Sequence, residues 1–135
     1  LEPVDLNIIV SSIQVLAEFT AWETWANFPH ERKRLLDMLQ ATSAGRTILL
    51  SGDVHRGEIS VLPMDGWQLI ELTSSGLSAD MYPGKPNIYR LGPAYPIHNF
   101  GSLALAVKDN IITVNAGLYD QAGALLGNQS ITINN

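Results

Sequence analysis

The spacing of apolar residues predicts a strand, a loop and a helix in the first third of the chain. Residues 6–10 form a short β-branched apolar run typical of a strand. Residues 17–28 mix aromatic and polar side chains without a clear period, which predicts a loop. In residues 29–42, leucines recur at the spacing of an amphipathic helix. Pro29 suits the first turn, where no N–H is needed, and Gly45 is a stop signal.

From residue 47 onward the pattern is that of β-strands. Residues 47–50 form a continuous apolar run typical of a buried strand. Residues 58–62 and 67–72 flank Pro63-Met64-Asp65-Gly66, a typical hairpin turn. After a long loop, three more strands are expected at residues 102–107, 111–116 and 125–133. The loop covers residues 74–98, and so long a loop in a compact domain is often functional.

Composition narrows the classes of protein that fit this pattern. The 135 residues suit one domain or part of a larger one, and a hydrophobic content of 46% allows a packed core. A net charge of -5, with no basic cluster beyond residues 32–34, argues against a nucleic-acid-binding surface. The absence of cysteine excludes disulfides and cysteine-ligated zinc. No stretch is long and apolar enough to span a bilayer.

A carboxylate and an imidazole stand two residues apart directly after the strand expected at residues 47–50. The carboxyl ends of strands are where α/β sheets place ligands, and residues two apart in an extended chain point the same way. We therefore expect Asp53 and His55 to reach one site, with donors that suit iron, manganese or zinc. In the alternative interpretation, Asp53 only caps a turn and His55 is a partly buried polar residue. Glu58 is expected at a strand edge rather than as a third ligand.

Four motifs follow one another along nearly the whole chain. Residues 22–36 form a Trp-rich loop that leads through Phe-Pro into a helix with Arg and Leu-Leu. Residues 51–55 read Ser-Gly-Asp-Val-His, a strand ends in Thr-Ser-Ser-Gly within residues 71–78, and residues 99–101 are Asn-Phe-Gly. In this order the motifs resemble those of the PhoD-like alkaline phosphatases of the calcineurin-like metallophosphoesterase superfamily. The resemblance implies an α/β fold in which residues 1–135 are the C-terminal half of a two-sheet sandwich, mostly β with one long helix.

The resemblance also implies an activity. Members of the family hold two or more metal ions, iron with calcium in some, which bind phosphate and activate a water that attacks phosphorus. By resemblance this chain belongs to an enzyme that hydrolyses phosphomonoesters or phosphodiesters, in which Asp53 and His55 are catalytic as late metal ligands. Trp25 and Asn99 are predicted to contact the substrate. Residues 26–27 are Ala-Asn where many relatives carry Asp-Gly, so one carboxylate of the loop is missing. A secreted or cell-envelope location would fit the family, but the residues do not fix a compartment.

The earlier motifs of the superfamily, Gly-Asp-x-x-Asp and Gly-Asn-His, are absent from the sequence. The Trp-rich loop upstream argues against Asp53 and His55 being an early Asp-x-His pair. We therefore expect the N-terminal half of the same enzyme to supply the other ligands, and the isolated chain to have weak or no activity. The competing hypothesis is a non-catalytic β-rich binding or structural module in which the pair is a remnant.

Several other side chains have two interpretations each. His98 either adds an imidazole to the site or faces solvent, and His30 is expected to be exposed. Helix arginines such as Arg32 and Arg34 either reach a phosphate or are solvated. Three aromatic residues either wall the substrate cleft or cover the joint between helix and sheet: Trp22, Trp25 and Phe28. Three residues of the long loop are candidates for its rim: Tyr82, Lys85 and Tyr89.

Overall fold

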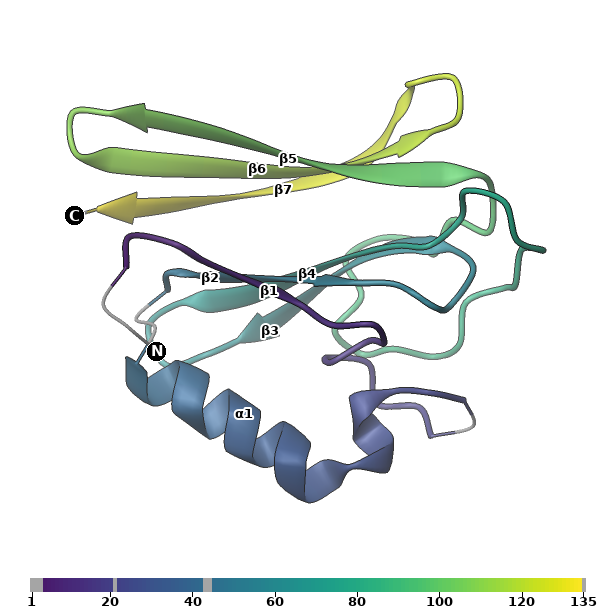
Figure 1. Cartoon of the computed structure of the whole chain (residues 1–135), viewed down its shortest axis with the longest axis horizontal. Coiled ribbons are helices and arrows are strands. Elements are labelled where there is room, and N and C mark those ends of the chain that lie inside the picture. The colour runs from purple at the N-terminus through teal and green to yellow at the C-terminus, as the bar shows by residue number, and fades with distance from the viewer. Residues whose placement is uncertain (1–3, 21, 43–44, 135) are drawn as a thin grey trace.

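Two β-sheets and one long helix lie in three layers in the computed structural model, which describes residues 4–20, 22–42 and 45–134 (Figure 1). The α/β class, mostly β with one long helix, is confirmed. The helical elements are η1 (Trp25–Asn27) and α1 (Pro29–Thr42). The strands are β1 (Asn7–Val10), β2 (Thr47–Ser51), β3 (Gly57–Pro63), β4 (Gln68–Ser74), β5 (Asn99–Lys108), β6 (Ile111–Asp120) and β7 (Leu125–Asn134).

The first sheet has the strand order β1-β2-β4-β3. β1, β2 and β4 run parallel, and β3 is antiparallel to β4. The expected hairpin is confirmed, because Pro63 pairs with Gln68 and the Met64 N–H donates to the Trp67 carbonyl at 2.9 Å. Gly66 has a φ of 80°, which a residue without a side chain adopts at little cost.

Helix α1 has the bounds that the sequence predicts and covers one face of this sheet (Figure 1). The connection through it lets β1 and β2 run parallel, since parallel neighbours need a long crossover. Leu39 is its fully buried residue, and Leu35 and Leu36 are partly buried beside it. The buried residues of this layer are Val15, Leu16, Leu39, Leu49 and Leu69.

The second sheet has the order β5-β6-β7, is antiparallel throughout, and covers the other face of the first sheet (Figure 1). Its three strands are confirmed but each is longer than the pattern predicts. Asp109 and Asn110 both have positive φ, as the tight turn between β5 and β6 requires. The apolar core between the sheets consists of Ile48, Ile59, Ile70, Leu72, Ile112, Val114, Ala116, Leu118 and Ile133.

Candidate functional site

The chain turns sharply where β2 ends, and this turn carries Asp53 and His55. The expectation of an extended segment is wrong: φ is 70° at Asp53 and 52° at His55, so both lie in the left-handed region. The Val54 N–H donates to the Gly52 carbonyl at 3.0 Å, which closes a tight turn that no strand geometry allows. Left-handed backbone costs about 1–2 kcal/mol for a residue with a side chain. The turn therefore exists only because its surroundings hold it.

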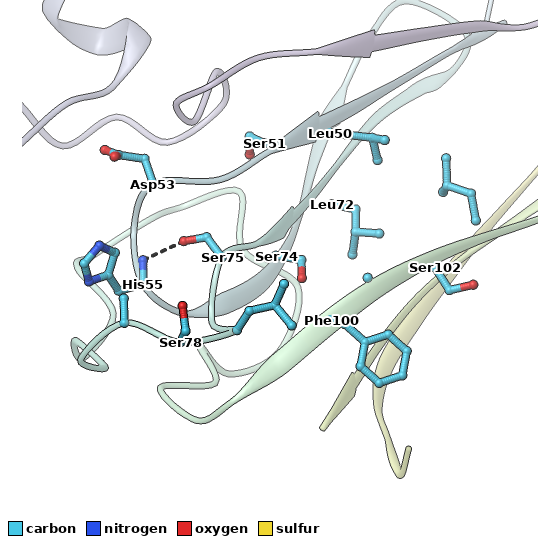
Figure 2. A pocket seen from close by; sticks show the side chains of 14 residues that line it. Leu50, Ser51, Asp53, His55, Leu72, Ser74, Ser75, Ser78, Phe100 and Ser102 are labelled. Carbon is cyan, nitrogen blue, oxygen red and sulfur yellow. Dashed lines mark hydrogen bonds between the residues drawn. The ribbon is translucent and has the colours of Figure 1, made fainter. Parts of the chain in front are cut away.

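Three segments hold this turn through its backbone. The His55 N–H donates to the Ser75 Oγ at 2.7 Å, as Figure 2 shows. The Tyr82 N–H donates to the His55 carbonyl at 3.3 Å. The Arg56 guanidinium donates to the Val54 carbonyl at 3.2 Å. The residue after β4, the long loop and the residue before β3 thus all hold the backbone of Val54 or His55.

The imidazole of His55 has one nitrogen occupied and one available. Its Nδ1 lies 2.9 Å from the Asp80 carbonyl oxygen, which can only accept a hydrogen bond, so Nδ1 carries the proton. Nε2 is then the basic nitrogen. A backbone carbonyl that orients an imidazole in this way is common behind metal-binding histidines. His55 is half-buried, and its ring stacks on that of Tyr82 with 5.1 Å between the centroids.

Asp53 and His55 lie between two cavities. A cavity of about 730 Å³ opens between the sheets and is lined by serines and apolar residues of β2, β4 and β5. Figure 2 shows Asp53 and His55 at its rim, away from the apolar wall of Leu50, Leu72 and Phe100. A smaller cavity of about 360 Å³ is lined by Trp22, Glu23, Asp53, Val54, His55 and Tyr82. The pair is thus accessible from two directions.

Among the residues that the structure describes, no group of three or more His, Cys, Asp or Glu side chains is placed to hold a metal ion. Asp53 and His55 therefore stand as a pair. Metal ions in proteins take roughly four to six ligands. The described residues alone do not form a complete metal centre.

Behind the turn lies a buried ionic network centred on Glu58, which the sequence pattern did not reveal. Glu58 is the second residue of β3, the outer strand of its sheet, and its side chain is fully buried. Its Oε2 accepts from the Arg56 Nε at 3.1 Å and the Arg90 Nε at 3.0 Å. Gln14 donates to its Oε1 at 2.7 Å. Burial acts to raise the pKa of Glu58, but the Gln14 hydrogen bond and the two guanidinium charges outweigh it, so the pKa lies below its usual value.

A second buried carboxylate, Glu71, holds the segment after β1. Its two oxygens accept the backbone N–H groups of Val15 and Leu16 at 2.7 and 2.8 Å. Burial raises the pKa of Glu71 because these hydrogen bonds do not fully replace the lost water. Arg32 donates to the carbonyls of the same two residues at 2.7 and 2.9 Å. Arg32 is therefore committed to this backbone, and neither sequence interpretation of it holds.

The structure does not bring the two predicted substrate contacts into either cavity. Trp25 packs in the layer between helix and sheet, and its Nε1 donates to the Ser11 Oγ at 3.0 Å. Asn99 is buried at the start of β5, where it accepts from the Ser74 hydroxyl at 3.1 Å and donates to the Ile97 carbonyl at 2.7 Å. Both side chains are occupied by the fold.

Of the other residues that the sequence singled out, some lie beside the turn and others lie away from it. Trp22 lines the smaller cavity and meets Tyr82 edge-on, with 5.3 Å between the ring centroids. The Lys85 Nζ lies 4.7 Å from the centroid of the Trp22 ring. His98 is exposed and its Nδ1 lies 3.0 Å from the Gly76 carbonyl. The remaining candidates lie away from the turn: His30 and Phe28 are exposed, Arg34 pairs with Glu31 on the helix surface, and Tyr89 donates to Glu18.

The sequence motifs reveal neither buried carboxylate. The partners of Glu58 come from positions 14, 56, 87 and 90, and those of Glu71 from positions 15 and 16. The one available signal is a glutamate in each of two mostly apolar strand-forming runs, at the start of residues 58–62 and within residues 67–72. Such a residue inside a strand of a two-faced sheet must either face water or meet buried partners.

Comparison with solved structures identifies a class of fold. The chain superimposes on a structure described as "Structure of PhoD" with a TM-score of 0.59 and 13% sequence identity. The match covers 91% of this chain and 32% of the other, so the chain spans about a third of the length of that protein. No family model matches the sequence, and no curated protein matches it. At this identity the likeness concerns the fold alone, which is similar to part of the PhoD structure.

No helix among the described residues is long and apolar enough to cross a membrane.

Proposed function

We propose that this chain is part of a metal-dependent phosphoesterase that hydrolyses phosphomonoesters or phosphodiesters. In this proposal residues 1–135 are the C-terminal portion of a metallophosphoesterase domain, and Asp53 and His55 are two of its metal ligands. The observation that carries the proposal is the left-handed backbone at both residues, held at the carboxyl end of β2. Strained backbone of this kind persists where a functional site requires it.

The donors of the pair fit a metal ion. The exposed carboxylate of Asp53 is available at the end of the strand, and the Asp80 carbonyl leaves the His55 Nε2 as the free nitrogen. An oxygen donor beside an imidazole suits iron, manganese or zinc, and calcium would take further oxygen ligands. Bound metal ions would offset the charge of a phosphate ester and lower the pKa of a water molecule.

The residues around the pair have supporting roles in the proposal. Ser75, Arg56 and Asp80 hold the turn and the imidazole in place. Trp22 and Tyr82 line the cavity beside His55 and are in position to contact a substrate. Trp25 and Asn99, the substrate contacts that the sequence predicts, would instead act by holding the Trp-rich loop and the start of β5.

The remaining ligands would come from the N-terminal half of the same enzyme. A pair of donors falls short of the four to six that a metal ion takes. The PhoD match leaves about two thirds of that structure without a counterpart in this chain, which is room for the missing half of a site. The activity then belongs to the completed protein, and the chain alone is expected to be nearly inactive.

Calorimetric titration with iron, manganese or calcium tests the ligand pair. In the completed protein we expect stoichiometric binding that is lost in His55→Ala and Asp53→Asn. His30→Ala and His98→Ala are matched controls, because both histidines are exposed and line neither cavity beside the turn. Failure to bind metal in the completed protein would support the competing function, a non-catalytic β-rich module.

Hydrolysis of a chromogenic phosphodiester tests the division of the site. The purified 135-residue chain, supplied with the same metals, is expected to show weak or no turnover. Robust turnover by the chain alone, abolished by Asp53→Asn, would show that the chain holds a complete site and would contradict the proposed division.

A further inference from the structure

The smaller cavity beside the turn has walls from three segments that are far apart in the sequence. Trp22 and Glu23 come from the Trp-rich loop, Asp53, Val54 and His55 from the turn, and Tyr82 from the long loop. Its volume of about 360 Å³ lies at the small end of the range of about 300–1,000 Å³ that ligand sites occupy. The proposed metal pair uses the turn, so the two loops are left to contact a group attached to the phosphate.

The aromatic rings of the cavity form a corner rather than a slot. The rings of Trp22 and Tyr82 meet at an interplanar angle of 70°, with 5.3 Å between their centroids. The Tyr82 ring is also stacked on that of His55, at 27° and 5.1 Å. Neither arrangement leaves two parallel faces between which a flat third ring would fit. A compact group seated in the corner would instead touch both Trp22 and Tyr82, and Tyr82 is 41% exposed and therefore accessible.

The charges of the cavity walls favour a cation. Glu23 and Asp53 contribute exposed carboxylates, and no lysine or arginine is among the described residues that line the cavity. Aromatic faces attract ammonium groups through the negative charge above the ring. The Trp22 ring already has such a neighbour outside the cavity, because the Lys85 Nζ lies 4.7 Å from its centroid. Aromatic surface and carboxylates together fit an ammonium group better than a second anion.

We propose that this cavity binds the ammonium group of the substrate, with Trp22 and Tyr82 as its aromatic walls and the Glu23 carboxylate as its counter-charge. This inference rests on the proposed function, which places the phosphate at Asp53 and His55. It names the substrate class, which is a phosphate ester of an amino alcohol, and quaternary ammonium groups are the ligands that aromatic walls suit best. In the hydrolysis the water oxygen forms the new bond to phosphorus, the bond from phosphorus to the amino alcohol oxygen breaks, and that oxygen takes up a proton.

Calorimetric titration of the completed protein with choline tests the cavity without any turnover. The comparison ligand is 3,3-dimethylbutan-1-ol, which has the shape of choline but no charge. We expect saturable binding of choline, about tenfold tighter than binding of the neutral alcohol. Glycerophosphocholine and vesicles of phosphatidylcholine then distinguish a free ester from a lipid headgroup as the source of the ammonium group.

Substitutions in the walls test whether choline binds in this cavity. Trp22→Leu and Tyr82→Leu should each weaken choline binding by about fivefold, whereas Tyr82→Phe keeps the ring and the affinity. Glu23→Gln should weaken it by about threefold, as expected for an exposed counter-charge. Tyr119→Leu is the matched control, because Tyr119 stacks on Phe100 at 5.4 Å and does not line this cavity.

Two outcomes would overturn the inference. One is equal affinity for choline and the neutral alcohol, and the other is choline binding that survives both Trp22→Leu and Tyr82→Leu. Binding of inorganic phosphate that is lost in Lys85→Gln, without binding of choline, would assign the cavity to an anion instead. Choline binding without metal binding would count against the proposed function and leave the ammonium site standing. Metal binding without choline binding would do the reverse.

Discussion

The two faces of the four-stranded sheet are built from alternate residues of the same strands, yet they differ in kind. On β3 and β4, Ile59, Ile70 and Leu72 face the second sheet and form a continuous apolar core. The adjacent residues Glu58 and Glu71 face the helix side and are equally buried, on a face that also carries Leu49 and Leu69. The apolar face packs the two sheets together but holds no particular loop in place.

The buried ionic side chains of the other face form hydrogen bonds that hold loops in place. Glu58 and Arg56 lie behind the turn of Asp53 and His55, and Glu71 holds the backbone at Val15 and Leu16. Burying a charge costs free energy unless the charge is paired. We therefore expect buried charges where they hold a loop that apolar packing alone would not fix. The comparison teaches that the ionic network on one face of the sheet helps to hold the left-handed turn, together with the hydrogen bonds to Ser75 and Tyr82.

The largest effect is expected from Arg56→Ala, which leaves Glu58 buried without its nearest charge on the turn side. We expect a loss of about 3–5 kcal/mol in the free energy of unfolding, measured by denaturant titration. Protection of the His55 amide against exchange should fall further than that of β6. Arg34→Ala is the control: this exposed surface pair should contribute under about 1 kcal/mol. A loss that small for Arg56→Ala would contradict the role of the polar face.

Ile70→Ala tests the apolar face of the same sheet. Ile70 is 1% exposed, and removing its side chain should lower the free energy of unfolding by about 2–5 kcal/mol. The turn should keep its local protection relative to the rest of the protein, because no contact that holds it involves Ile70. If the His55 amide lost protection selectively in this variant too, the separation of the two faces would be wrong.

Asp53→Gly probes the strain in the turn. Glycine adopts a φ of 70° without the penalty of a side chain but is more flexible when unfolded, so the two effects partly cancel. We expect thermal unfolding to show unchanged stability or a gain of up to about 1 kcal/mol, with loss of metal binding. Asp53→Ala keeps the strain and should give no such gain. A clear destabilisation by Asp53→Gly would mean that the carboxylate serves the fold.

A change of pH is expected to have a smaller net effect on the free energy of unfolding. The contributions of the two buried carboxyl groups, Glu58 and Glu71, depend on pH in opposite directions. The pKa of Glu58 is lowered from 4.5, so its stabilising contribution is present above that value and is lost as pH falls through the lowered pKa. The pKa of Glu71 is raised, so its contribution is present below 4.5 and is lost as pH rises through the raised pKa.

Urea titrations of two variants across pH would separate these contributions. Glu71→Gln should leave the acid-side loss due to Glu58, and Glu58→Gln should leave the loss on raising pH due to Glu71. Identical pH profiles for the two variants would contradict the assigned directions.

The sequence predicted the elements well where a local pattern determines them. Helix α1 begins at Pro29, because proline fixes its own φ, and the β3–β4 hairpin turns at Asp65-Gly66, because glycine permits a positive φ. The β5 and β6 strands were predicted too short, since the missed ends contain Gly101 and Gly117, which break the apolar pattern while cross-strand pairing continues. For β7 only the last residue, Asn134, was missed.

The candidate site was predicted less completely. The sequence singled out Asp53 and His55 by their position after a strand, but it assigned them an extended backbone that the structure replaces with a left-handed turn. Contacts of Ser75, Asp80 and Tyr82 with His55 join positions 20 to 27 residues apart in sequence, which no local spacing reveals.

By itself the sequence determined the helix, the strands, their turns and the pair of residues with metal-ligand chemistry, because these depend on local periodicity and on side-chain type. Only the tertiary structure decided the burial of Glu58 and Glu71, the hand of the turn at Asp53 and His55, and the cavity that Trp22 and Tyr82 line beside that turn. These depend on which distant segments supply hydrogen bonds, charge or cover, and such partners are fixed only when the sheets pack together.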